Sequence, residues 1–158
     1  MILMNLYLVQ HSEAKSKEED PQRSLSDKGL ADIKKISAFI SKHFNIQVKS
    51  IMHSGKTRTL QTAEILSKHL KLLEYIQQVD GLDPLAVPSI WVERLAKIKE
   101  DIMLVGHLPH LSKLSSLLIC QDENKTIINF KNAGVVSLNR AESGIWSVQW
   151  IVIPEILI

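Results

Sequence analysis

Residues 1–12 read MILMNLYLVQHS, a nine-residue apolar run that ends in the polar group Gln10, His11 and Ser12. The run lacks the basic start and the small-residue cleavage site of a signal peptide. No segment approaches the ~20 apolar residues that a membrane span requires, so no membrane partner is expected. We therefore expect Met1–Val9 to be the buried first strand of a sheet, with the polar group just beyond its end.

The same order of an apolar strand followed by a polar group recurs along the chain. Between the apolar runs, hydrophobic residues recur at helical spacing, and Ser26 stands where an N-cap is expected. The predicted strands are 1–9, 48–52, 75–79, 101–105, 135–138 and 146–153, and the predicted helices begin near residues 27, 57, 88 and 109.

Strands alternate with helices until two strands follow each other near the end. This order predicts an α/β fold of three layers, a doubly wound, mostly parallel sheet with a C-terminal antiparallel hairpin. With 158 residues, the chain is expected to form a single domain over 1–158. Trp146 and Trp150 are four residues apart in the last strand, which places both on one face of it.

Charge and cysteine content exclude several classes of protein. Nineteen basic residues against seventeen acidic ones leave a net charge of +2, and no dense basic patch appears, so a nucleic-acid partner is not expected. Cys120 is the only cysteine, which excludes an internal disulfide and a thiolate metal cluster. This cysteine usage fits the reducing cytoplasm.

Three polar groups follow predicted strands, and in a doubly wound sheet such positions converge on one crevice. They carry His11, His53 and His107, with Arg58 one turn beyond the second group. A neutral imidazole is a competent nucleophile toward phosphorus, and a guanidinium can bind the phosphoryl oxygens through two parallel hydrogen bonds. His11 as nucleophile, with Arg58 and His107 as phosphate ligands, is therefore a coherent set. Taken singly, each of these residues also has an ordinary structural interpretation.

Four segments also match one known pattern in order. They are LVQHSEA (8–14), RSLSDKG (23–29), SGKTRTLQTAE (54–64) and VGHLP (105–109). Together they resemble the histidine phosphatase superfamily, most closely its small SixA-type phosphohistidine phosphatases. The resemblance implies a phosphoglycerate mutase-like fold and a phosphatase without metal or cofactor, in which His11 carries a covalent phosphoryl group and Arg58 and His107 bind phosphate.

The resemblance also implies a substrate class. Larger relatives carry insertions that cap the site over small phosphosugars, and this chain has no insertion of that size. An open site suits a phosphorylated protein. In the SixA group that protein is a histidine-containing phosphotransfer domain of a signalling relay.

Two residues depart from the family pattern. Gln10 stands where the family has arginine, and Ser12 stands where it has glycine. Both are expected to contact the phosphate, but Gln10 brings no charge. Replacing a charged hydrogen bond by a neutral one in the transition state is expected to lower the rate of the reaction roughly tenfold. The alternative function is therefore a catalytically weakened module that binds phosphate or a phosphoprotein.

The sequence leaves three further points open. Asp80 and Asp83 are candidates for a general acid, although aspartate also favours turns. A metal hydrolase built on the three strand-end histidines is an alternative that lacks an obvious carboxylate ligand. The apolar tail Ile151–Ile158 is either an ordered end or a patch through which the chain forms a homodimer.

Overall fold

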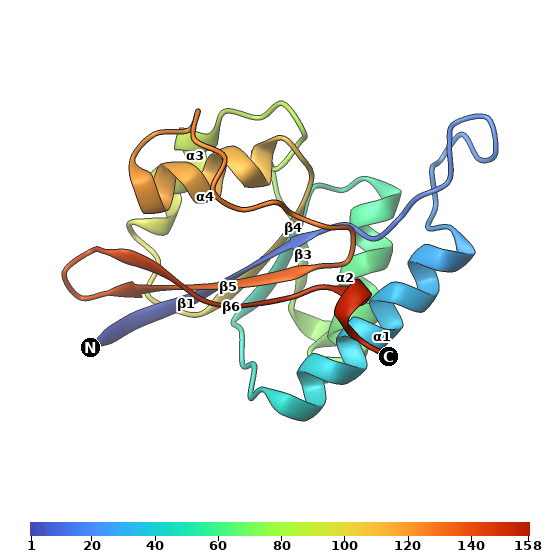
Figure 1. The fold of residues 1–158 in the computed structure, drawn as a ribbon, viewed down its shortest axis with the longest axis horizontal. Helices are drawn as coiled ribbons and strands as arrows, with labels where there is room; N and C mark the ends of the chain where they lie inside the picture. The colour runs from blue at the N-terminus through green and yellow to red at the C-terminus, as the bar shows by residue number, and fades with distance from the viewer.

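The structure is a computed structural model that describes residues 1–158. Its six strands form one mixed sheet in the order β3-β2-β4-β1-β5-β6 (Figure 1). The β1–β4, β4–β2 and β2–β3 pairs are parallel, and β1–β5 and β5–β6 are antiparallel. The strands are β1 (Ile2–Gln10), β2 (Ser50–His53), β3 (Ile76–Gln78), β4 (Ile102–Gly106), β5 (Val135–Ala141) and β6 (Trp146–Val152).

Helices cover both faces of this sheet (Figure 1). One face packs against α1 (Asp27–His43) and α2 (Thr57–Leu70), and the other against α3 (Pro88–Leu95) and α4 (His110–Cys120). Two short 3-10 helices complete the fold, η1 (Leu73–Tyr75) and η2 (Pro154–Ile156). The predicted three-layer, doubly wound arrangement with a C-terminal antiparallel pair is confirmed.

The buried central strand β1 explains why its sequence is apolar without alternation. Tyr7 and Val9 point into the core under α1 and α2, whereas Leu6 and Leu8 point into the core under α3 and α4. A strand that buries both faces needs apolar residues at every position. Ser26 caps α1 as expected, because its hydroxyl accepts a hydrogen bond from the backbone N–H of Gly29.

The prediction that Trp146 and Trp150 share a face is wrong. On β5, Ser137 pairs with Trp150 of β6 and the next residue, Leu138, pairs with Val148. One residue of β6 between these pairs is therefore bulged and has no partner on β5. A bulge reverses the alternation of side chains beyond it. Trp150 therefore packs on the core under α1 and α2, and Trp146 packs on the opposite core.

The apolar C-terminal tail folds back along α1 (Figure 1). Leu157 packs against the core, and its carbonyl accepts a hydrogen bond of 3.3 Å from Lys35 Nζ. Ile156 and Ile158 remain exposed. The tail is therefore an ordered end, as one of the two interpretations expected, and a homodimer through its exposed residues stays a prediction. No helix has both the length and the apolar character that crossing a membrane requires.

Candidate active site

The carboxyl ends of β1 and β4 lie together and present two histidines. His11 follows β1 directly, and its backbone N–H donates to the carbonyl of Gly106, the last residue of β4, over 3.0 Å. His107 follows β4, and the centroids of its ring and the His11 ring are 5.1 Å apart. The parallel pairing of these strands thus places side by side two histidines that are 96 positions apart in the sequence.

The His11 ring has a defined tautomer. Its Nδ1 lies 2.7 Å from the carbonyl oxygen of Ser12, and because a carbonyl only accepts, Nδ1 carries the hydrogen. In the neutral ring the lone pair is then on Nε2. Burial lowers the pKa of His11 to about 4, and the charges of Arg58 and Arg23 lower it further against the opposing effect of the Ser12 carbonyl. His11 is therefore neutral at pH 7, with Nε2 available as a nucleophile.

A chain of hydroxyl groups sets the tautomer of His107. Thr59 donates to the Lys56 carbonyl over 2.8 Å, so Ser54 donates its hydrogen to Thr59 over 2.9 Å. Nε2 of His107 lies 2.7 Å from the Ser54 hydroxyl and must then donate to it. Nδ1 of His107 has no partner. Burial, followed by the neighbouring positive groups, lowers the pKa of His107 to about 3, so the ring is neutral at pH 7.

Arg58 occupies the first turn of α2, beside a cavity of about 420 Å³. The cavity contains more basic than acidic side chains, and its lining residues are Lys17, Arg23, Lys56, Arg58, Asp83, Pro84 and Leu85. Nε of Arg58 is buried and has no hydrogen-bond partner. Burial and then the charge of Arg23 lower the pKa of Arg58. An unpaired guanidinium among other cations is suited to an anionic ligand.

Ser12 has a structural role that argues against the prediction that it binds phosphate. Its side chain is fully buried, and its hydroxyl donates to the Gly29 carbonyl over 2.6 Å. Its backbone N–H donates to the Thr62 hydroxyl over 3.0 Å. The side chain that replaces the family glycine thus joins the strand end to α1 rather than facing the site.

Gln10 is held by a neighbour outside the cavity. Its amide Nε2 donates to Asn132 Oδ1 over 2.7 Å, and its Oε1 is buried without a partner. Gln10, like His11 and His107, is not among the residues that line the basic cavity. Its amide donor is engaged by Asn132, and its contact with phosphate stays a prediction.

The two acid candidates lie in different surroundings. Asp80 pairs with Arg94 of α3 over 2.7 Å and is largely exposed. Asp83 lines the basic cavity and lies 3.8 Å from Lys56 Nζ. Asp83 therefore lies among the basic side chains around Arg58, and the role of either aspartate as an acid stays a prediction.

The third strand-end histidine takes no part in a cluster of metal ligands. Nδ1 of His53 accepts a hydrogen bond of 3.0 Å from the backbone N–H of Gly55. No group of three His, Cys, Asp or Glu side chains has a geometry that could hold a metal ion. The arrangement therefore does not support the metal hydrolase alternative.

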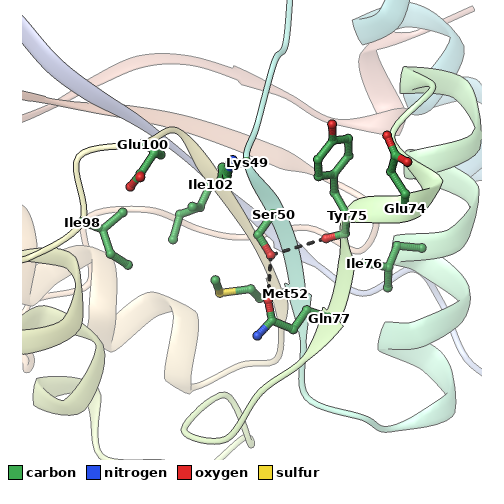
Figure 2. A pocket seen from close by; sticks show the side chains of 10 residues that line it. All are labelled: Lys49, Ser50, Met52, Glu74, Tyr75, Ile76, Gln77, Ile98, Glu100 and Ile102. Atoms are coloured by element: carbon green, nitrogen blue, oxygen red, sulfur yellow. Dashed lines mark hydrogen bonds between the residues drawn. The ribbon is translucent and has the colours of Figure 1, made fainter.

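A second hollow lies at the opposite ends of the strands (Figure 2). It has a volume of about 430 Å³ and is lined by the first residues of β2, β3 and β4. Figure 2 shows that the Ser50 hydroxyl bonds to the Tyr75 carbonyl and to Gln77 Oε1, over 3.4 and 3.3 Å. The hollow contains no histidine, and its central hydroxyl is already paired, so it offers no candidate for the predicted histidine nucleophile.

The sequence analysis missed three residues of the site. Arg23 lines the cavity with a backbone φ of 51°, and Ser54 holds His107. His110 is fully buried, and neither of its ring nitrogens has a partner. Arg23 and Ser54 stood within the matched segments, but nothing in their spacing indicated these contacts.

Neither a protein-family model nor a curated protein matches the sequence. Solved structures do match it. The protein histidine phosphatase SixA complexed with tungstate is 19% identical, with a TM-score of 0.83 over 96% of this chain and 97% of that one. A structure assigned as phosphohistidine phosphatase SixA of Agrobacterium tumefaciens is 20% identical, with a TM-score of 0.76 over 95% and 97%.

The likeness extends beyond these phosphatases. Phosphoglycerate mutase of Bacillus anthracis strain Sterne is 14% identical, with a TM-score of 0.69 over 92% of this chain and 91% of that one. Near-complete coverage in both directions means that all three structures share one arrangement of helices and strands. The chain therefore has the phosphoglycerate mutase-like fold, at a length close to that of the two solved SixA structures.

Proposed function

We propose that this protein is a cytoplasmic, metal-independent phosphohistidine phosphatase that transfers the phosphoryl group of its substrate to His11. The observation that carries the proposal is the His11 ring. Its Nδ1 is bonded to the Ser12 carbonyl, its pKa is lowered to about 4, and it lies beside His107 near the unpaired guanidinium of Arg58. The SixA structure with bound tungstate, an oxyanion, supports an anion site in this fold.

The proposed reaction has two steps. In the first, the Nε2 lone pair of His11 attacks phosphorus and the bond from phosphorus to the substrate imidazole breaks. That imidazole, already protonated on its other ring nitrogen, leaves as the neutral ring. In the second, water attacks phosphorus, the bond to Nε2 breaks, and inorganic phosphate is released with His11 neutral again. Arg58 stabilises the negative charge on the phosphoryl oxygens in both transition states.

Two observations favour a phosphorylated protein over a small phosphate ester. Leu85 lines the cavity but is 87% exposed, which offers an apolar contact to a partner surface next to the anion site. An imidazole leaves more easily than an alkoxide, so a phosphohistidine lessens the need for the acid that Asp83 would supply. We infer that the substrate is a histidine-containing phosphotransfer domain.

The test is phosphate release from such a domain phosphorylated on histidine, without added metal. We expect release by the wild-type protein, a base-stable and acid-labile phosphoryl group on the enzyme, and loss of both in His11→Ala. His43→Ala, which removes an exposed histidine at the end of α1, is the matched control. Release that persists in His11→Ala would refute the covalent mechanism.

A second candidate function is a module that binds phosphate or a phosphoprotein without turnover. It is favoured by Gln10, whose amide is bonded to Asn132 and adds no charge to the site. This function predicts that the wild-type protein binds the phosphorylated domain with no phosphoenzyme and no phosphate release. The same experiment therefore separates the two functions.

A further inference from the structure

Arg23 is held in an unusual backbone conformation at the edge of the basic cavity. Its φ of 51° lies in the left-handed region, which is uncommon for residues other than glycine. The turn is tied down on both sides, because the backbone N–H of Arg23 donates to the Asp20 carbonyl over 2.8 Å and its Nε donates to the Lys15 carbonyl over 3.0 Å.

These two bonds leave the outer end of the guanidinium free. No hydrogen bond or ion pair of this structure involves its two terminal nitrogens, and the side chain lines the same cavity as Arg58. Its charge also reaches the reacting groups, since it contributes to the lowered pKa of both His11 and Arg58. Two guanidinium groups that repel each other across a cavity gain from an anion placed between them.

The residue before His11 does not supply such a charge. Gln10 is neutral, and its amide is engaged by Asn132 away from the cavity. The proposed reaction nevertheless places developing negative charge on three phosphoryl oxygens, of which a single guanidinium can pair with only two. A second cation would bind the remaining oxygen. Arg23 offers two free terminal nitrogens at the cavity that it shares with Arg58, Lys17 and Lys56.

We propose that Arg23 is a phosphate-binding residue that acts with Arg58 and supplies the positive charge that Gln10 does not. This inference rests on the proposed function for the identity of the anion. It assigns to the loop 11–25 a direct part in binding.

The test measures oxyanion binding, which does not depend on turnover. Calorimetric titration with tungstate and with inorganic phosphate is carried out on the wild-type protein, Arg23→Gln and Arg23→Lys. We expect Arg23→Gln to weaken binding at least tenfold, and Arg23→Lys to retain affinity within about threefold of wild type. Both variants lose the guanidinium, and only Arg23→Lys keeps its positive charge, whereas the amide of Arg23→Gln can still donate to the Lys15 carbonyl as Nε does. Lys68→Gln, which removes one exposed positive charge from the far end of α2, is expected to bind as wild type does.

Equal weakening in Arg23→Gln and Arg23→Lys would show that the positive charge of Arg23 does not bind the oxyanion, and it would overturn the proposal. Wild-type affinity in Arg23→Gln, or no oxyanion binding by the wild-type protein, would also overturn it. Failure of the proposed function has a different signature. In that case the wild-type protein binds the oxyanions and responds to Arg23→Gln as expected, but releases no phosphate from the phosphorylated domain.

Discussion

Ser12 illustrates how a single residue can differ from a family pattern without entering the site. Its hydroxyl donates to the Gly29 carbonyl, and its backbone N–H donates to Thr62, so the residue links β1, α1 and α2 just behind His11. The extra side chain therefore reinforces the support of His11. The sequence alone could not distinguish this arrangement from a phosphate contact, because both use the same hydroxyl.

We expect Ser12→Ala to lower stability and leave phosphate binding unchanged. The loss of one buried hydrogen bond costs about 1 kcal/mol, which corresponds to a fall in Tm of about 2–4 °C for a chain of this length. Thermal unfolding and calorimetric titration with phosphate measure the two effects. A tenfold loss of phosphate affinity with an unchanged Tm would restore Ser12 as a ligand.

Among the elements, α1 approaches the loop after β1 more closely than an ordinary helix could. A Cβ built on Gly29 would lie 2.0 Å from the Glu13 carbonyl oxygen, far inside van der Waals contact. The absence of a side chain therefore lets the first turn of α1 lie against residues 12 and 13. This contact helps to hold His11 at the end of β1.

We expect Gly29→Ala to destabilise the protein by more than about 2 kcal/mol, because backbone atoms must move to relieve the clash. The displaced loop also carries the support of His11, so phosphate affinity is expected to fall. Urea unfolding and phosphate titration are the measurements. Ala31→Ser, a small enlargement at an exposed position of the same helix, is the control. A Gly29→Ala protein with wild-type stability would contradict the close approach.

At the scale of the whole molecule, several histidines are buried in the neutral state. Burial is the main cause that lowers the pKa of His11 and His110 to about 4 and that of His107 to about 3. An unfolded histidine has a pKa of about 6.5, so between that pH and about 4 the unfolded chain binds protons that the folded chain does not. The free energy of unfolding must therefore fall as the pH falls through this window.

Below pH 6.5, we expect each of these histidines to lower the free energy of unfolding by at most about 1.4 kcal/mol for each unit by which the pH falls. His110→Leu removes one of them together with two unpaired ring nitrogens, so its stability should depend less steeply on pH. Chemical unfolding at intervals from pH 7 to 4.5 tests this, with exposed His43→Gln as the control. Parallel curves for His110→Leu and the wild-type protein would contradict the assignment.

The distribution of exposed apolar residues over the molecule bears on the substrate. Leu85 is 87% exposed beside the basic cavity, and Ile145 is 66% exposed in the turn between β5 and β6. If Leu85 contacts a partner protein, Leu85→Ser should raise KM for a phosphorylated phosphotransfer domain at least threefold. It should change kcat/KM for a small phosphoramidate by less than twofold. Ile145→Ser should leave both unchanged, and equal effects of Leu85→Ser on the two substrates would contradict a docking role.

The sequence by itself determined the order of helices and strands, because apolar periodicity and capping residues are local signals. It also placed His11, Arg58 and His107 at strand ends and a helix start, which the parallel sheet then brought to one edge. Only the tertiary structure decided which neighbouring side chains face the site. Gln10 and Ser12 are adjacent to His11 in the chain, yet their polar groups bond to Asn132 and Gly29. Arg23 stands twelve residues away and lines the cavity. The physical reason is that a hydrogen-bond partner is set by contacts between segments that are distant in the sequence. The bulge in β6, which puts Trp146 and Trp150 on opposite faces of the sheet, likewise depends on the pairing of β6 with β5.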